Sequence, residues 1–244
     1  MSPEHRELLA QLRQASRPTS AERHQSDSYG GSGHLFYFVS APDRRAIARA
    51  WVASHRSTTP QAVLAVVESL VDGQSHEEKT LGALLIGCHA PARAAVRPGD
   101  LDRWLGKLNG WAEIDCQCHN LFAAAQMLAD WPAWRGLIEQ LSKDQNINKR
   151  RASLVLLNGP VRYCDDERFA DLALAVIDRL KAERAILITK AISWLLRSMV
   201  QRHRRAVEDY LAAQGPTLPR IAVRETNAKL ATGVKAGRRR PIRS

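Results

Sequence analysis

Apolar residues recur along most of the chain at the three- and four-residue spacing of amphipathic helices. The first such segment, residues 2–15, carries Leu8, Leu9 and Leu12 on one face. From residue 41 onward the pattern predicts a succession of helices separated by short connections rich in Pro, Gly, Ser, Thr or Asn. We expect these helices at residues 43–55, 61–71, 79–88, 101–108, 113–129, 133–142, 146–157, 166–180, 183–199, 202–213 and 218–230.

Local signals mark several helix ends. Pro42 opens the helix that begins at residue 43, and Ser75-His76-Glu77-Glu78 is similar to a capping box. Asn158-Gly159-Pro160 indicates a firm stop. Residues 34–39 could form a strand, but no second strand signal follows for it to pair with. We therefore interpret them as an apolar segment that leads into a helix.

Successive helices with short connections favour antiparallel pairs stacked into a solenoid, although the repeat is weak in residue identity. We predict an all-α fold, a HEAT-like α-solenoid of antiparallel helix pairs with a concave basic groove. We divide the chain into an N-terminal helix with a flexible loop (residues 1–33), a HEAT-like-repeat domain (residues 34–232) and a basic C-terminal tail (residues 233–244).

The composition and net charge of the 244-residue chain indicate what kind of partner it binds. A hydrophobic content of 45% excludes a disordered protein, and the formal charge of +11 favours a polyanionic partner. Residues 200–244 hold eleven Lys and Arg against three acidic residues. Nucleic acid and an anionic membrane surface are both such polyanionic partners, and this basic end is the first candidate for contact with backbone phosphates; a solvated tail is the alternative for residues 233–244.

The N-terminal residues and the cysteines bear on the compartment. Glu4, Arg6 and Glu7 interrupt the start of the chain, which lacks the apolar core of a signal peptide, and no apolar run has membrane length. Four irregularly spaced cysteines argue against a disulfide framework. We predict a cytoplasmic protein that does not associate with membranes.

The segment from Leu108 to Phe122 carries the candidate chemistry. Trp111 and Asp115 are four residues apart, so a helix would present indole and carboxylate on the same face. Such a pair suits a cationic ligand, and a core Trp beside a helix-capping Asp is the alternative. Cys116 and Cys118 would point about 200° apart on a continuous helix. This geometry disfavours a zinc site, and we expect no metal and no other cofactor.

Four separated motifs follow one another along the chain. They are Val39-Ser40-Ala41-Pro42-Asp43-Arg44-Arg45, Trp111-Ala112-Glu113-Ile114-Asp115, Asn146-Ile147-Asn148-Lys149-Arg150-Arg151-Ala152 and Lys190-Ala191-Ile192-Ser193-Trp194-Leu195-Leu196-Arg197. From about residue 29 to about residue 230, the chain resembles the AlkD-type DNA alkylation repair glycosylases, HEAT-like-repeat proteins that excise alkylated purines. The fourth motif is the most specific of the four.

The resemblance implies a role for each matching residue. Asp115 would be the catalytic carboxylate, Trp111 and Trp194 the aromatic walls against the damaged nucleotide, and Tyr29 a further residue of the cleft. Arg151 would contact the DNA backbone. The family usually shows a double Trp before the Asp, whereas here Asn109-Gly110 precedes a single Trp.

Other basic residues near these motifs are expected to contact DNA phosphates. Arg150 adjoins the matching arginine and could take its place. The remaining expected contacts are Lys190, Arg197, Arg202, Arg205 and Arg224.

The resemblance implies an enzyme that hydrolyses the N-glycosidic bond of 3-alkyladenine and 7-alkylguanine in duplex DNA, and we expect it to act as a monomer. A fixed carboxylate would stabilise the positive charge that develops on the sugar and would orient water. The alternative is a non-catalytic member of the same superfamily that recognises branched or damaged DNA. A helical scaffold for other proteins is a third possibility, distinguished by salt-insensitive binding.

Overall fold

The structure of the chain is a computed structural model that describes residues 1–17, 31–119 and 121–235. These residues form α-helices, their connections, one 3₁₀ turn (Gly215–Thr217) and one isolated bridge between Leu35 and Ser75, so the predicted all-α class is confirmed. No helix in the described part of the chain is long and apolar enough to cross a membrane. Most of the predicted flexible loop and basic tail lies outside the described residues.

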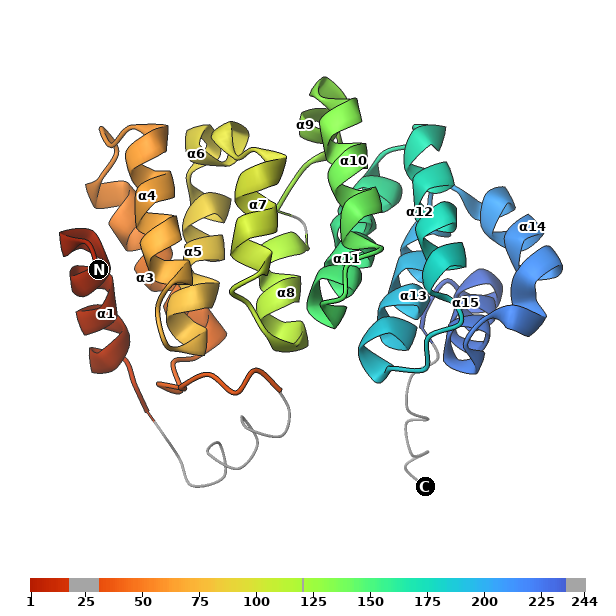
Figure 1. Cartoon of the computed structure of the whole chain (residues 1–244), viewed down its shortest axis with the longest axis horizontal. Coiled ribbons are helices and arrows are strands. Elements are labelled where there is room, and N and C mark those ends of the chain that lie inside the picture. The colour runs from red at the N-terminus through yellow and green to blue at the C-terminus, as the bar shows by residue number, and fades with distance from the viewer. Residues whose placement is uncertain (18–30, 120, 236–244) are drawn as a thin grey trace, which may run out of the picture. The chain divides into compact units, whose positions relative to one another are not determined.

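The chain folds into two compact units, Met1–Leu137 and Ile138–Ser244, and the division falls inside helix α10 (Trp131–Leu141). The first unit holds the helices α1 Pro3–Gln14, α3 Ala41–Ser54, α4 Pro60–Val71, α5 His76–Cys88, α6 Ala90–Ala95, α7 Pro98–Leu105, α8 Gly110–Cys118 and α9 Ala124–Ala129 (Figure 1). The second unit holds α11 Ile147–Tyr163, α12 Glu167–Leu180, α13 Ile186–Met199, α14 Arg204–Gln214 and α15 Arg220–Thr232. The sequence pattern did not predict α6.

The helix starts follow the capping signals of the sequence. Ser40 and Thr59 cap α3 and α4, each followed by a proline in the first turn. At α5 the Ser75 side chain accepts a hydrogen bond from the Glu78 amide, and the Glu78 carboxylate accepts one from the Ser75 amide. The predicted capping box is therefore confirmed.

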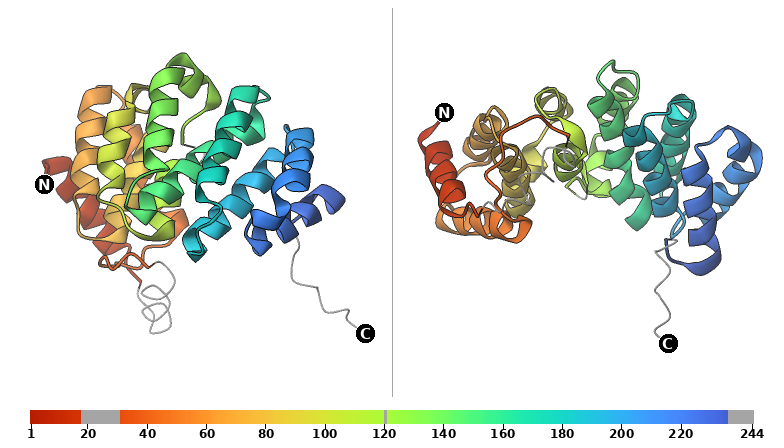
Figure 2. Two further views of the ribbon diagram at one scale, coloured as in Figure 1. Left: turned by 45° about the vertical axis from the view of Figure 1, so that its right-hand side comes forward. Right: turned by 90° about the horizontal axis from the view of Figure 1, so that it is seen from below.

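Within each unit, one row of helices packs side by side, and a second row covers it. In the first unit α5 contacts both α3 and α8, and α4 covers α5. In the second unit α13 contacts both α11 and α15, and α12 packs on α11 (Figure 2). This alternation is the layered order of a helical solenoid, in which each repeat buries its apolar face against its neighbour. The concave basic groove stays a prediction.

One predicted helix is interrupted. The pattern predicted a continuous helix over residues 113–129, but α8 ends at Cys118 and His119 adopts an extended conformation. Phe122 is 2% exposed and its ring lies 5.0 Å from that of Trp134, so burying this ring requires the chain to leave the helical path. The prediction was wrong because tertiary packing outweighs a local sequence that contains neither Gly nor Pro.

A second helix continues past its predicted end. Asn158-Gly159-Pro160 was expected to close the helix, yet α11 runs through Pro160 to Tyr163. An internal proline costs about 3 kcal/mol because it removes a backbone hydrogen bond. Here the segment is buried, and the Asn158 amide donates to the Leu154 carbonyl while its oxygen accepts from the Ser198 hydroxyl. Packing against α13 therefore offsets the proline, and this prediction was also wrong.

A carboxylate on α4 ties that helix to α7 and to the turn that follows it. Glu68 accepts hydrogen bonds from Arg103 (3.1 Å), from the Trp104 indole (2.5 Å) and from Lys107 (2.8 Å). Burial alone raises the pKa of Glu68, but these three donors outweigh it and lower the pKa from 4.5 to about 2. The charged form of Glu68 therefore stabilises the fold.

We expect Glu68→Gln to lower the free energy of unfolding by about 1 kcal/mol at pH 7, a modest value because the side chain is 29% exposed. The stabilisation by a carboxylate with a lowered pKa is complete above its ordinary pKa of 4.5 and is lost as the pH falls toward about 2. Urea unfolding at a series of pH values should show the difference between wild type and variant narrowing below pH 4.5. A difference that stays constant with pH would contradict this assignment.

Candidate active site

Helix α8 presents the predicted indole and carboxylate together. Trp111 and Asp115 both lie within α8 and both are partly exposed. Four residues of α-helix bring side chains to the same face, so the local arrangement predicted from the spacing is confirmed. Gly110, just before the Trp, has φ of 72°, a left-handed conformation that favours glycine.

A second carboxylate on α8 has a different environment. Glu113 is 1% exposed and accepts hydrogen bonds from His34 Nδ1 (2.9 Å), from His76 Nδ1 (3.3 Å) and from the Asn109 amide (2.9 Å). Its three donors come from the segment before α3, from α5 and from the residue that caps α8. Glu113 therefore fixes the start of α8 within the first unit.

The pKa of Glu113 reflects these contacts. Burial by itself raises the pKa, but the hydrogen bonds from His76, the Asn109 amide and His34 outweigh burial, so the pKa lies below the ordinary value of 4.5. Glu113 is thus a charged group whose acceptor positions are used inside the protein. Of the two carboxylates on α8, only Asp115 combines partial exposure with a position one helical turn from an indole.

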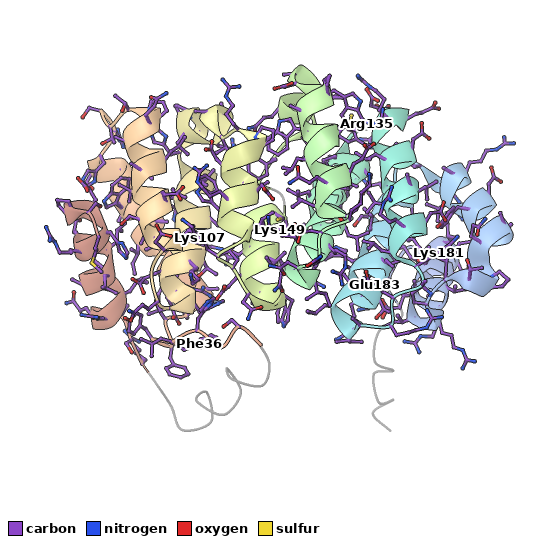
Figure 3. The ribbon with its side chains drawn as sticks, in the orientation of Figure 1. Phe36, Lys107, Arg135, Lys149, Lys181 and Glu183 are labelled. Carbon is purple, nitrogen blue, oxygen red and sulfur yellow. The ribbon has the colours of Figure 1, made fainter. Side chains whose placement is uncertain are left out.

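A chain of donors extends behind Glu113. Arg44 Nη1 donates to His76 Nε2 (3.2 Å), so the His76 ring carries its hydrogen on Nδ1 and donates it to Glu113. The Arg44 guanidinium also donates to the Thr80 hydroxyl, and burial lowers the pKa of Arg44. Phe36, labelled in Figure 3, stacks on the His76 ring with centroids 4.8 Å apart. These contacts lock the orientation of the imidazole.

Sequence reasoning missed this network. Glu113 and Arg44 belong to the motifs quoted above, but His34 and His76 are separated from Glu113 by 79 and 37 residues. No local spacing links these histidines to Glu113. The one available signal was a pair of acidic residues two positions apart on a helix, which must face different directions.

The two cysteines of α8 serve its packing. Cys116 donates from its thiol to the Thr80 carbonyl with a 3.7 Å separation, and burial raises the pKa of this thiol. Cys118 is 2% exposed. The environment of Cys116 does not favour the thiolate that a nucleophile or a metal ligand requires.

In the second unit, three predicted residues share one stripe of α13. Lys190 is exposed, and Trp194 and Arg197 are partly exposed, at spacings of four and three residues. The Arg197 guanidinium also lies 3.4 Å from Glu225 of α15, whose carboxylate accepts from the Ser193 hydroxyl at 2.7 Å. The stripe therefore presents an indole between two cations, on a helix fixed to its neighbour.

The adjacent arginines of α11 make internal contacts. Arg150 forms a two-pronged ion pair with Glu183, with separations of 2.7 and 3.1 Å. Arg151 is 5% exposed and donates to the Leu187 carbonyl. In this structure both guanidinium groups therefore secure α11 to the segment around the start of α13, and their predicted contact with DNA stays a prediction.

The remaining predicted residues differ in exposure. Arg202, Arg205 and Arg224 are exposed, and the Arg205 side chain, 94% exposed, lies 3.8 Å from Asp209. Their contact with DNA stays a prediction. Tyr29 lies outside the described residues.

Comparisons with known proteins identify a matching family and a solved structure with a similar fold. The family model described as DNA alkylation repair enzyme matches residues 8–230. The fold is similar to that of a solved structure described as a predicted DNA alkylation repair enzyme from Enterococcus faecalis, with a TM-score of 0.70 and 16% sequence identity over 89% of this chain and 97% of that chain. No curated protein sequence is similar enough to match the chain.

Proposed function

The chain belongs to the DNA alkylation repair enzyme family, and from this premise we propose that it is a DNA glycosylase specific for cationic alkylated purines. The reaction is hydrolysis of the N-glycosidic bond of 3-alkyladenine or 7-alkylguanine in duplex DNA. The observation that carries the proposal is the partly exposed pair Trp111 and Asp115 on α8, beside a Glu113 whose acceptors are already occupied.

Asp115 is proposed to act through its negative charge. As the bond to the base lengthens, positive charge develops on the sugar, and a fixed carboxylate stabilises that charge and orients the attacking water. The base of a 7-alkylguanine is already cationic, so it leaves as a neutral molecule without prior protonation. The site therefore needs one carboxylate and no general acid.

Indole rings supply the second element of the proposed site. The face of Trp111 attracts a cationic base by about 0.5 to 2 kcal/mol and keeps water away from it. Trp194, on the stripe of α13, is proposed to contribute a second aromatic surface against the damaged nucleotide. Lys190 and Arg197 on the same stripe, with Arg202, Arg205 and Arg224, are proposed to bind backbone phosphates.

The proposed mechanism is tested by comparing the release of cationic and neutral damaged bases. Duplexes that contain 7-methylguanine, 3-methyladenine or the neutral base hypoxanthine are incubated with the purified protein, and the released bases are quantified. We expect release of the two methylated bases and no release of hypoxanthine, because the site supplies no proton to a neutral leaving base. Release of hypoxanthine at a comparable rate would contradict the single-carboxylate mechanism.

A further inference from the structure

The second unit contains a cavity that the proposed glycosylase site does not use. It has a volume of about 720 Å³ and lies between the connection from α12 to α13, the first turn of α13 and residues 216–221. Lys181 and Glu183, labelled in Figure 3, lie in that connection. The volume is in the range of small-molecule sites in proteins.

The residues that line the cavity are cationic or uncharged. Lys181, Arg184 and Arg220 belong to its wall, and no carboxylate of the described residues does. Lys181 is partly neutralised by the Asp178 carboxylate, 2.7 Å from its ammonium, and the ammonium also donates to the side-chain oxygen of Gln214 at 2.8 Å. Arg184 and Arg220 are exposed, and Arg184 also donates to the Lys181 carbonyl at 3.3 Å. The two arginines therefore supply most of the attraction for an anion.

The rest of the wall suits an anion attached to an organic group. Pro216, Leu218 and Ile221 provide apolar surface beside the two arginines. The first turn of α15 also belongs to the wall, and its amides add partial positive charge to that of the side chains. A phosphodiester linked to a sugar has this combination of charge and apolar surface.

The position of the cavity relates it to the stripe on α13. Thr189, a residue of the cavity wall, directly precedes Lys190. From Thr189 to Trp194 the rise along the helix is about 7.5 Å. Five residues also turn the side chain by about 140° around the helix axis, so a strand whose nucleotide contacts Trp194 must pass around α13 to place a nearby phosphate at the cavity.

We propose that this cavity binds a backbone phosphate of the DNA strand that crosses α13, with Arg184 and Arg220 as its ligands. The inference rests on the proposed function and extends the DNA contact beyond the basic residues assigned above. The same chemistry would also fit a free phosphate, and the experiment separates the two sources.

The test measures the affinity of the full-length protein for duplex DNA at several salt concentrations. Each phosphate contact contributes about 0.9 to the slope of log affinity against log salt concentration. Because both arginines bind the same phosphate, we expect Arg184→Gln/Arg220→Gln to reduce the slope by about 0.9. The matched control is Arg168→Gln/Arg179→Gln, which removes two exposed arginines of α12 that do not line the cavity. We expect the control to keep the wild-type slope, and thermal unfolding checks that both variants fold.

Three results would overturn the proposal. The slope could stay at the wild-type value in the cavity variant, or it could fall equally in both variants, which would indicate a net-charge effect. Alternatively, inorganic phosphate could raise the melting temperature of wild type and not of the cavity variant while the DNA slope stays unchanged, which would assign the cavity to a free phosphate. Wild-type protein that does not bind DNA would instead refute the proposed function.

Discussion

Replacing Asp115 by asparagine is expected to reduce the single-turnover rate of 7-methylguanine excision by about 10²- to 10³-fold. Asparagine has nearly the same shape, but it lacks the charge that stabilises the positive sugar in the transition state. DNA affinity should not fall, because the substitution removes a negative charge from a surface proposed to face phosphates. Single-turnover rates at saturating protein, with dissociation constants measured in parallel, separate these two effects.

The matched control is Asp171→Asn, which removes an exposed carboxylate from α12. We expect this variant to excise at the wild-type rate, so that loss of activity is specific to α8. Equal rates for Asp115→Asn and wild type would show that Asp115 does not carry the chemistry. A parallel loss of DNA affinity and rate would assign Asp115 to binding.

Replacing Glu113 by alanine is expected to lower the free energy of unfolding by about 3 to 5 kcal/mol, the cost of breaking a buried charged network by removing one partner. His34, His76 and the Asn109 amide would lose their shared acceptor. Urea unfolding followed by circular dichroism measures the effect at pH 7, where the wild-type carboxylate with its lowered pKa is charged.

Glu208→Ala is the matched control, since Glu208 forms an exposed ion pair with Arg204 on α14. Exposed pairs contribute about 0 to 1 kcal/mol, so this variant should stay close to wild type. If Glu113→Ala costs no more than Glu208→Ala, the network around Glu113 does not hold the start of α8.

The sequence predicted most helices because capping residues and apolar spacing act locally. Ser75 and Glu78 show this, since the capping box signals the start of α5 and the structure contains both of its hydrogen bonds. The two wrong helix predictions both result from contacts between residues far apart in the sequence. The break after Cys118 follows from burial of Phe122 against Trp134, and the continuation through Pro160 follows from packing on α13. Neither neighbour is visible from local spacing.

In the candidate site, too, the local features could be predicted from the sequence and the contacts between distant segments could not. The pairing of Trp111 with Asp115 needed only the geometry of one helical turn, so the spacing predicted it. Arg151 shows the limit of such reasoning, because a basic residue in a motif says nothing about its burial, and here the side chain is 5% exposed. The network around Glu113 depends on contacts between distant segments, and no local pattern in the sequence records them.

Release of 7-methylguanine and 3-methyladenine from methylated duplex DNA by the wild-type protein tests the central claim most directly. The account predicts that both bases appear in solution and leave abasic sites in the DNA in equal amounts. Salt-sensitive binding to the same duplex without release of either base would contradict it. That result would identify the chain as a non-catalytic, DNA-binding member of its family.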